Sequence, residues 1–529
     1  MSSSSITLPA TAHPSTGKVT NKWAVAVAVG AGALLEVIDT SIVNVALTDI
    51  QASVGATLSQ VSWVVSSYAV ANVIVLPMSA WLGQRFGKKR YFVFSLIGFT
   101  VASMLCGMAT SLSFLVFARI LQGLMGGGLL AKAQAFLYET FPREEQAVAQ
   151  GFFGAVVIAG PVLGPTLGGY ITTHSEWRWI FFINAPVGIA AVLLCLQALP
   201  RDEPDAAPRA RVDWLAIALL AIGLGSLQTM LEEGNSEGWF DSPLIVALLL
   251  GASAGISWFV HRQLHAVEPI VDLRVLRYRS LAAGSLLSIV IGVALYGALF
   301  AVPIFATSIL HFTAQQTGLL LMPGALVSAM AMQLAARLSR RFDPRRVLVA
   351  GGLILVFSLG WLGQLSPATG ERDLLWPLLV RALGTVLMFL PLNLSTIGPI
   401  PKADVSKATG IFNLTRQLGG SMGVALLSTV LDRRVAFHRE VLTSHVSATD
   451  PLVSERLDQL SQLYGSQGAS ASEAHAQALT ALDGLVQQQA SILSFNDTFF
   501  LVALLVLASL PLVFLLGKPT EDTDVAELH

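Results

Sequence analysis

Charged side chains are scarce in this 529-residue sequence: Asp, Glu, Lys and Arg together make up only 12% of it. An ordinary soluble domain carries about 25% charged residues. Hydrophobic residues reach 54%, and the mean hydropathy is +0.67. A soluble chain of this length would need far more polar surface, so the composition excludes a soluble protein and predicts an integral membrane protein.

Other scarcities exclude further classes. The two cysteines, Cys106 and Cys195, both fall in apolar runs, which predicts neither a disulfide nor a metal site. The formal net charge of -1 gives no sign of a nucleic-acid partner. The sequence shows no clustered metal ligands, no nucleophile motif and no soluble catalytic region. A membrane enzyme, receptor or channel is therefore a weak alternative, and we expect no cofactor besides a proton gradient.

Long apolar runs are what the sequence has instead. A membrane-crossing helix needs about 20 mostly apolar residues, and helices are expected because lipid offers no partner to free backbone groups. Fourteen stretches qualify, which predicts an all-α integral membrane fold with 14 transmembrane helices. They are 23–46, 61–82, 91–109, 113–136, 147–171, 178–199, 213–231, 243–261, 281–307, 316–336, 347–364, 373–396, 407–431 and 497–516.

Lys and Arg set the expected orientation. They concentrate in alternate loops, such as QRFGKKR at 84–90 and RLSRRFDPRR at 337–346, and such loops lie on the cytoplasmic side. Both termini are then cytoplasmic. The first residues are rich in Ser, Thr and Pro without a cleavable signal pattern, so we expect a disordered tail.

An internal repeat indicates how the spans are grouped. AWLGQRFGKKR at 80–90 and ARLSRRFDPRR at 336–346 share a Leu-x-x-Arg-Phe frame, although two basic loops can also match by chance. The copies follow spans 2 and 10, so two six-helix bundles with two inserted helices are expected, an arrangement typical of alternating-access transporters. The expected divisions are 1–22 cytoplasmic tail, 23–199 first bundle, 200–265 linker and inserted helices, 266–280 cytoplasmic loop, 281–516 second bundle with a periplasmic loop at 432–496, and 517–529 cytoplasmic tail.

Two carboxylates stand in the first span. Glu36 and Asp39 are three residues apart and share one helix face. Asp39 lies about 10 Å from the outer end of span 1, and Arg119 about 9 Å from the same side of span 4, at 1.5 Å per residue. Ionised groups in a membrane pair or line a water-filled cavity. We therefore predict an Asp39–Arg119 pair, with Gln122 near the level of Glu36.

Such a pair has two interpretations. It carries coupled protons if its protonation changes with conformation, or it is a static structural ion pair. Glu36 either shares the proton-coupling role or meets a cationic substrate.

Other polar residues within the spans are candidate contacts. Lys132 is expected to reach the cytoplasmic end of its helix or to pair with Glu139. Arg381 and Arg416 are the charged residues inside the second bundle and would suit an anion. The candidate substrate contacts, each equally consistent with packing, are Asn44, Trp63, Tyr68, Gln122, Gln333, Asn393, Asn413, Arg416 and Gln417.

Span 5 contains AGPVLGPTLGG at 159–169. Glycines every four residues make a smooth face that permits close helix approach, and prolines favour a bend. The residues in question are Gly160, Pro161, Gly164, Pro165, Gly168 and Gly169. This pattern suits a gate at a bundle interface, and ordinary small-residue packing is part of the same interpretation.

Six segments in order resemble one family over nearly the whole chain. They are IDTSIVNVAL (38–47), LGQRFGKKR (82–90), FARILQGLMGG (117–127), GPVLGPTLGG (160–169), WRWIFFINAPVGI (177–189) and ATGIFNLTRQLGGSMG (408–423). The chain resembles the fourteen-helix drug:proton antiporter branch of the major facilitator superfamily, and within it the EmrB-type multidrug exporters.

The resemblance implies roles for motif residues. Asp39 and Arg119 would couple protons, and the span 5 motif would control leakage and bending. The cytoplasmic gate would use Gly83, Gln84, Arg85, Gly87 and Arg90. Gln84 stands where the family usually has an acidic residue, which would reduce a charge relay to a neutral hydrogen bond.

Residues 432–496 form the one long outer segment, with amphipathic stretches at 452–464 and 478–493. We expect short helices lying over the outer mouth. A structural cap is one interpretation. The other follows from the resemblance, since EmrB-type exporters work with a periplasmic adaptor and an outer-membrane channel, which implies the inner membrane of a Gram-negative bacterium.

The prediction as a whole is a proton-coupled multidrug efflux transporter of hydrophobic or amphipathic compounds. A narrow exporter of a fatty acid, siderophore or other metabolite in the same fold is the alternative.

Overall fold

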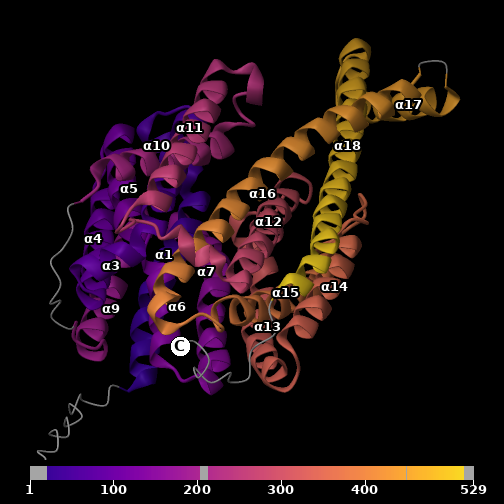
Figure 1. Ribbon diagram of the computed structural model, residues 1–529. Coiled ribbons are helices and arrows are strands. Elements are labelled where there is room, and N and C mark those ends of the chain that lie inside the picture. The colour runs from indigo at the N-terminus through magenta and orange to yellow at the C-terminus, as the bar shows by residue number, and fades with distance from the viewer. Residues whose placement is uncertain (1–20, 203–211, 448–449, 517–529) are drawn as a thin grey trace, which may run out of the picture.

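The computed structural model describes residues 21–202, 212–447 and 450–516, and every regular element in these ranges is a helix (Figure 1). The predicted tails lie almost wholly outside the described residues, and so does most of the 200–212 linker. The first bundle comprises α1 (Lys22–Val54), α2 (Leu58–Val75), η1 (Leu76–Met78), α3 (Ser79–Phe86), α4 (Lys88–Gly107), α5 (Leu112–Gly126), α6 (Leu129–Thr140), η2 (Arg143–Glu145), α7 (Gln146–His174), α8 (Trp179–Phe182) and α9 (Asn184–Ala198).

Two helices and two short turns follow. They are α10 (Trp214–Glu233), η3 (Trp239–Asp241), α11 (Pro243–His265) and η4 (Leu273–Arg277). The second bundle comprises α12 (Arg279–Ser308), α13 (Ala314–Arg341), α14 (Pro344–Leu362), α15 (Glu371–Ile397), α16 (Lys402–His445), α17 (Pro451–Ser466), α18 (Ala471–Ser509) and η5 (Leu510–Leu515).

Thirteen of the helical segments in the described ranges are long and apolar enough to cross a membrane. Three of them join two α-helices into one span, namely α2 with α3, α5 with α6 and α8 with α9. The remaining predicted span, 407–431, lies inside α16, which is less apolar because it carries Asn413, Arg416 and Gln417. Its apolar face packs against α12 in the interior of the second bundle. An all-helical membrane fold with fourteen spans accounts for these helices.

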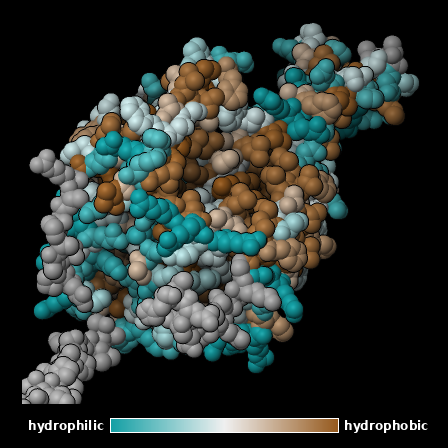
Figure 2. Space-filling view, in the orientation of Figure 1, coloured by the Kyte–Doolittle hydropathy of each residue, from teal (hydrophilic) through white to brown (hydrophobic). Residues whose placement is uncertain are grey.

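The two bundles lie side by side (Figure 1). We call the side on which α1 begins and α18 ends the terminal side, and the opposite side, where α17 lies, the distal side. The bundles meet through α7 against α13 and α6 against α16, while α10 packs on α11 and also reaches α2 and α16. Figure 2 shows a hydrophobic hollow between the bundles on the distal half and a hydrophilic surface on the terminal side.

The outer segment differs from the prediction of short helices over the mouth. Residues 478–493 are not a separate helix but the first part of α18, whose 39 residues continue into the last span. At 1.5 Å per residue α18 is about 58 Å long, roughly twice the 30 Å hydrocarbon core. The excess length of α16 and α18, with α17 packed on α18, makes a projection beyond the bundles (Figure 1). Ion pairs Arg434–Asp497 (2.5 Å) and Arg439–Asp483 (2.8 Å) join α16 to α18 there.

Candidate functional site

A buried ion pair lies in the middle of the first bundle. Asp39 on α1 is fully buried and Arg119 on α5 is 1% exposed, and Arg119 Nη1 donates to Asp39 Oδ2 at 2.6 Å. The depths predicted from helix rise brought these two together, and the pairing is present. Arg119 also donates from Nε to the Val64 carbonyl at 2.9 Å and lies over the ring of Tyr68, 4.3 Å from its centroid. The guanidinium is thereby fixed on three sides.

Two amides complete the surroundings of the carboxylate. Gln122 Nε2 and Asn184 Nδ2 donate to Asp39 Oδ1 at 2.8 and 2.7 Å, and Gln122 Oε1 accepts from Arg119 at 2.7 Å. Asn184 Nδ2 also donates to Ser103 Oγ at 3.0 Å. Sequence reasoning missed Asn184, although an Asn at the start of an apolar span was a usable signal. The carboxylate receives three donors, and a proton added to Asp39 would remove the negative charge that strengthens these bonds and balances Arg119.

Glu36 occupies a separate site one turn away. Its Oε1 accepts from Asn72 Nδ2 at 2.9 Å and its Oε2 from the backbone N–H of Leu130 at 3.0 Å. This N–H is free because span 4 is interrupted between α5 and α6, where the chain reads Gly126-Gly-Gly128, and a helix N-terminus favours a negative charge. Asn72 was also missed by sequence reasoning. Glu36 therefore binds the break in span 4, and no cation pairs with it in the described part of the chain.

The glycine face of α7 packs directly on α1 at the level of Asp39, but on another side of that helix. A Cβ on Gly160 would lie 2.3 Å from Val37, and one on Gly164 would lie 1.9 Å from Ser41 Oγ. A Cβ on Gly168 would lie 3.0 Å from Ile42. α7 continues as one helix through the whole motif, including Pro161, Pro165 and Gly169. The motif thus sets the distance between the helix that carries the acids and the helix that faces the second bundle through α13.

The bundles are joined by hydrogen bonds on the terminal half. Gln134 on α6 donates to Asn393 Oδ1 at 2.5 Å and accepts from Asn413 Nδ2 at 2.6 Å. Tyr138 Oη donates to the Asn393 carbonyl at 2.9 Å. The candidate substrate contacts Asn393 and Asn413 are therefore engaged across the bundle interface in this state. Gln134, one further polar residue in an apolar span, was not singled out from the sequence.

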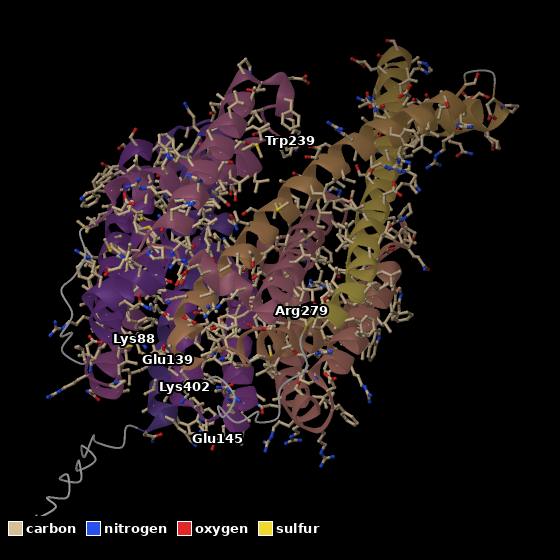
Figure 3. The ribbon with its side chains drawn as sticks, in the orientation of Figure 1. Lys88, Glu139, Glu145, Trp239, Arg279 and Lys402 are labelled. Carbon is tan, nitrogen blue, oxygen red and sulfur yellow. The ribbon has the colours of Figure 1, made fainter. Side chains whose placement is uncertain are left out.

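Lys132 also takes part in this interface, and the alternative that paired it with Glu139 was wrong. Its side chain is 2% exposed, and Nζ donates to Ser406 Oγ of α16 at 2.7 Å. Glu139 pairs instead with Lys88 at 2.8 Å (Figure 3). Lys132 fits because Gly83 has no side chain: a Cβ there would lie 2.4 Å from the lysine Nζ. Gly83 thus makes room for the buried side chain of Lys132, which reaches the other bundle.

The remaining candidate substrate contacts lie apart. Asn44, Trp63 and Gln333 are exposed, Gln417 is half-buried, and Tyr68 belongs to the Arg119 site. Arg416 is buried, donates to Asn413 and lies over Phe389, with 5.3 Å to the ring centroid. The structure therefore gathers only Tyr68 and Gln122 of the candidates around the Asp39 pair.

The loop at 82–90, where the cytoplasmic gate was expected, is held by a carboxylate from another segment. Gly87 has φ +95° and its Cα faces Asp202, whose carboxylate accepts the backbone N–H groups of Lys89 and Arg90 at 2.8 and 3.0 Å. Gln84 is exposed and forms no side-chain hydrogen bond with a described residue. The expected neutral hydrogen bond from Gln84 is absent there. Arg85 lies over Trp81, 5.5 Å from the ring centroid. Two carboxylates therefore meet this loop, Asp202 at its backbone and Glu139 at Lys88.

Comparisons with known proteins agree with this architecture. Residues 29–424 match the model of the Major Facilitator Superfamily. The chain is 32% identical to the multidrug export protein EmrB of Escherichia coli over 93% of this chain and 95% of that protein. It is 31% identical to the fatty acid resistance protein FarB of Neisseria gonorrhoeae over 94% and 96% of the two chains.

A solved structure extends the comparison to the fold. A double-tryptophan mutant of XylE superposes with a TM-score of 0.61 at 12% identity, over 95% of this chain and 97% of that one. The matches to sequence models and to curated relatives cover most of the chain. The protein therefore belongs to the major facilitator superfamily, and within it to the EmrB-like group.

Proposed function

We propose that the protein exports hydrophobic or amphipathic drugs in exchange for protons, with Asp39 as the coupling carboxylate. The observation that carries this proposal is the fully buried Asp39, held by Arg119, Gln122 and Asn184 on the helix against which the glycine face of α7 packs. EmrB of Escherichia coli is a multidrug export protein, and its similarity along the whole chain supports the same activity here.

The coupling follows from the donor set. The deprotonated carboxylate accepts all three donors with its charge, whereas a protonated one is neutral and holds the same donors, above all Arg119, more weakly. Releasing Arg119 in turn strips a buried guanidinium of its counter-charge, which is costly in a membrane. Protonation is therefore tied to movement of α5 or α9 against α1. Glu36 is the second candidate for a coupled proton, because it bridges α1 and the start of α6.

The state of the molecule fits one stage of such a cycle. The bonds of Lys132, Gln134 and Tyr138 close the bundles on the terminal half, and the hydrophobic hollow lies on the distal half (Figure 2). With both termini in the cytoplasm, as the Lys and Arg distribution predicts, this is an outward-facing state. Protons from outside would load Asp39 here and favour return to the inward-facing state after the drug has left.

The distal projection supports a tripartite assembly. We propose that a periplasmic adaptor, leading to an outer-membrane channel, docks on α17 and the ends of α16 and α18, in the inner membrane of a Gram-negative bacterium. Leu452 and Leu463 on α17 are 75% and 50% exposed, which leaves apolar side chains available to a helical partner. Leu452→Asp combined with Leu463→Asp should abolish drug resistance of cells and leave proton release by the purified protein intact. The exposed Gln459→Asp on the same helix serves as the control, and unchanged resistance in the double variant would contradict docking on α17.

The coupling proposal is tested by proton release. Tetraphenylphosphonium and rhodamine 6G are added to weakly buffered purified protein near neutral pH, and binding is measured separately by calorimetry. Wild type should release protons on binding, and Asp39→Asn should bind without release. Equal release from both would move the assignment to Glu36. Binding without release from wild type would contradict proton antiport.

A narrower exporter of amphipathic acids is the second candidate. It is favoured by Arg381, a buried cation of the second bundle, and by the 31% identity to the fatty acid resistance protein FarB.

A further inference from the structure

One buried cation, Arg381, has no partner among the residues that the structure describes. The side chain of Arg381 on α15 is 9% exposed, and within the described residues its guanidinium makes no hydrogen bond and no ion pair. An ionised group at membrane depth normally pairs or lines a water-filled cavity, and leaving it bare is costly. Arg416, the other buried arginine of the second bundle, differs because it donates to Asn413 and lies over Phe389, although its Nη1 has no partner among the described residues. Arg381 is therefore a buried guanidinium that makes none of its possible hydrogen bonds to the described residues.

Arg381 lines a cavity that both bundles build. Val157 and Ile158 of α7 form one wall, and Tyr296 of α12, Ser328 of α13 and Thr385 of α15 contribute to the others. The rest of the lining is apolar or small: Leu295, Leu321, Gly324, Ala325, Leu378 and Ala382. The cavity holds about 40 Å³ in this state. This is room for a small polar head group, and the tail of an amphipathic ligand must extend out of the cavity along α7 and α13.

The cavity has the position of a transport site. Arg381 is ten residues from the start of α15, which places it about 15 Å from the distal end of that helix, near the middle of a hydrocarbon core about 30 Å thick. Ile158 is two residues before Gly160, the glycine that packs on α1 at the level of Asp39. A ligand here would touch both bundles at the midplane, where their relative movement is felt most directly.

Three carboxylates of the spans are already engaged elsewhere. Asp39 is held by Arg119, Glu36 by Asn72 and the start of α6, and Glu233 by Ser66 at 3.0 Å. Using one of them as an internal counter-charge for Arg381 would require one of these bonds to break. The counter-charge that fits the geometry without such a change is supplied from outside the chain.

We propose that Arg381 binds the acidic head group of an amphipathic organic anion, whose apolar tail lies along the cavity wall formed by α7 and α13. The proposal rests on the export function above and names the substrate class of its central site. A planar guanidinium binds carboxylate or sulfonate through two parallel N–H donors. The tail is held by the apolar lining, so the site favours an anion over a neutral or cationic compound with the same tail.

The test compares three probes with the same ten-carbon chain in protein reconstituted into lipid nanodiscs. Decane-1-sulfonate carries a charge that does not titrate near neutral pH, 1-decanol is neutral, and decyltrimethylammonium is cationic. Acetate supplies the head group without a tail. Affinities are measured by calorimetry with empty nanodiscs subtracted, and the readout is the ratio of sulfonate affinity to ammonium affinity.

The wild type should prefer the sulfonate to the alcohol by at least tenfold and bind acetate at least a hundredfold more weakly. Arg381→Leu should lower the sulfonate-to-ammonium ratio at least tenfold, and Arg381→Lys should retain part of it. Ser328→Asp places a carboxylate in the cavity and should lower the ratio as strongly while supplying the missing counter-charge. Arg372→Leu removes an exposed arginine of the same helix and should leave the ratio unchanged.

Two results would overturn the proposal: an unchanged ratio in both Arg381→Leu and Ser328→Asp, or an equal loss of affinity for all three probes in Arg381→Leu. Acetate binding as tightly as the sulfonate would also overturn it, because the site would then be a simple anion site. Proton release is recorded in the same titrations. Sulfonate binding that depends on Arg381 but releases no protons would contradict the antiport function and leave the anion site standing.

Discussion

Replacing Asp39 by asparagine isolates the energetic role of the buried pair. The asparagine side chain has the same shape, but one of the two acceptor oxygens becomes an NH2 group that meets a donor instead of accepting from it. Arg119 is also left without a counter-charge. Breaking a buried pair by removing one partner costs about 3–5 kcal/mol, most of which is the penalty of the stranded charge. Replacing Arg119 by glutamine strands the carboxylate in the same way. The double variant strands neither charge.

The size of the effect can be expressed as a melting temperature. At about 2.1 cal/mol/K per residue, unfolding of a chain of this length changes the entropy by about 1.1 kcal/mol/K, so each single variant should lower the apparent Tm by about 3–5 °C. The double variant should recover at least half of the summed loss, which gives a coupling free energy of about 3 kcal/mol or more.

The assay is thermal unfolding in one detergent, followed by tryptophan fluorescence for wild type, both single variants and the double variant. Full recovery is not expected, because Arg119 also donates to the Val64 carbonyl and stacks on Tyr68. Losses that simply add in the double variant would refute the reasoning, since they would mean that neither charge depends on the other. A stable Asp39→Asn protein would instead show that water or a lipid reaches Arg119.

Three further predictions follow from other contacts. Gly164→Val places a side chain where even a Cβ would lie 1.9 Å from α1, so the drug resistance of cells should fall at least fourfold. The control Gly360→Ala has nothing within 4 Å of its Cβ and should leave resistance unchanged. Wild-type resistance in Gly164→Val would show that α7 can move aside freely. Ser406→Ala removes the hydrogen-bond acceptor of Lys132, and a charged hydrogen bond is worth about 1.5–3 kcal/mol. The population of molecules open on the terminal side, measured from double electron–electron resonance distances, should therefore rise about tenfold or more. An unchanged distance distribution would contradict a role of this bond in closure. The pKa of Asp213 lies below its usual value because Arg262 donates two hydrogen bonds to it. The stability that this pair contributes is complete above the unfolded pKa near 3.8 and is lost only as the pH falls through the lower folded pKa. Asp213→Asn should therefore change the apparent Tm by the same small amount throughout about pH 5.5–8, and a pH-dependent change in that range would contradict this assignment.

The glycine and asparagine motifs show where sequence reasoning works and where it ends. Glycines four residues apart predicted close helix approach, and the structure adds the partner: Val37, Ser41 and Ile42 of α1. Asn72 and Asn184 were visible as polar residues in apolar spans, yet no sequence pattern assigns them to Glu36 and Asp39. Which face of α2 or α9 turns toward α1 depends on packing between helices that are far apart in the chain.

The long outer segment and Lys132 illustrate the same limit. Amphipathic periodicity at 478–493 predicted a helix, but not that α18 would continue unbroken into the last span, since periodicity fixes helical structure and not where a helix ends. One of the two alternatives for Lys132 paired it with Glu139, which lies on the same helix. In the folded chain Lys88 pairs with Glu139, and Ser406 of the other bundle offers an acceptor 274 residues away in sequence.

The sequence by itself determined the membrane class, the spans, the family and the pairing of Asp39 with Arg119. These depend on local apolar length, on motif spacing and on a helix rise of about 1.5 Å per residue, none of which requires knowledge of neighbours. Only the tertiary structure decided that Glu36 binds the break in span 4, that Gln134 and Lys132 close the bundles on one side, and that Arg381 faces a cavity without a counter-charge. Those features depend on how helices rotate and pack against one another, which hydrophobic burial selects from the whole chain at once.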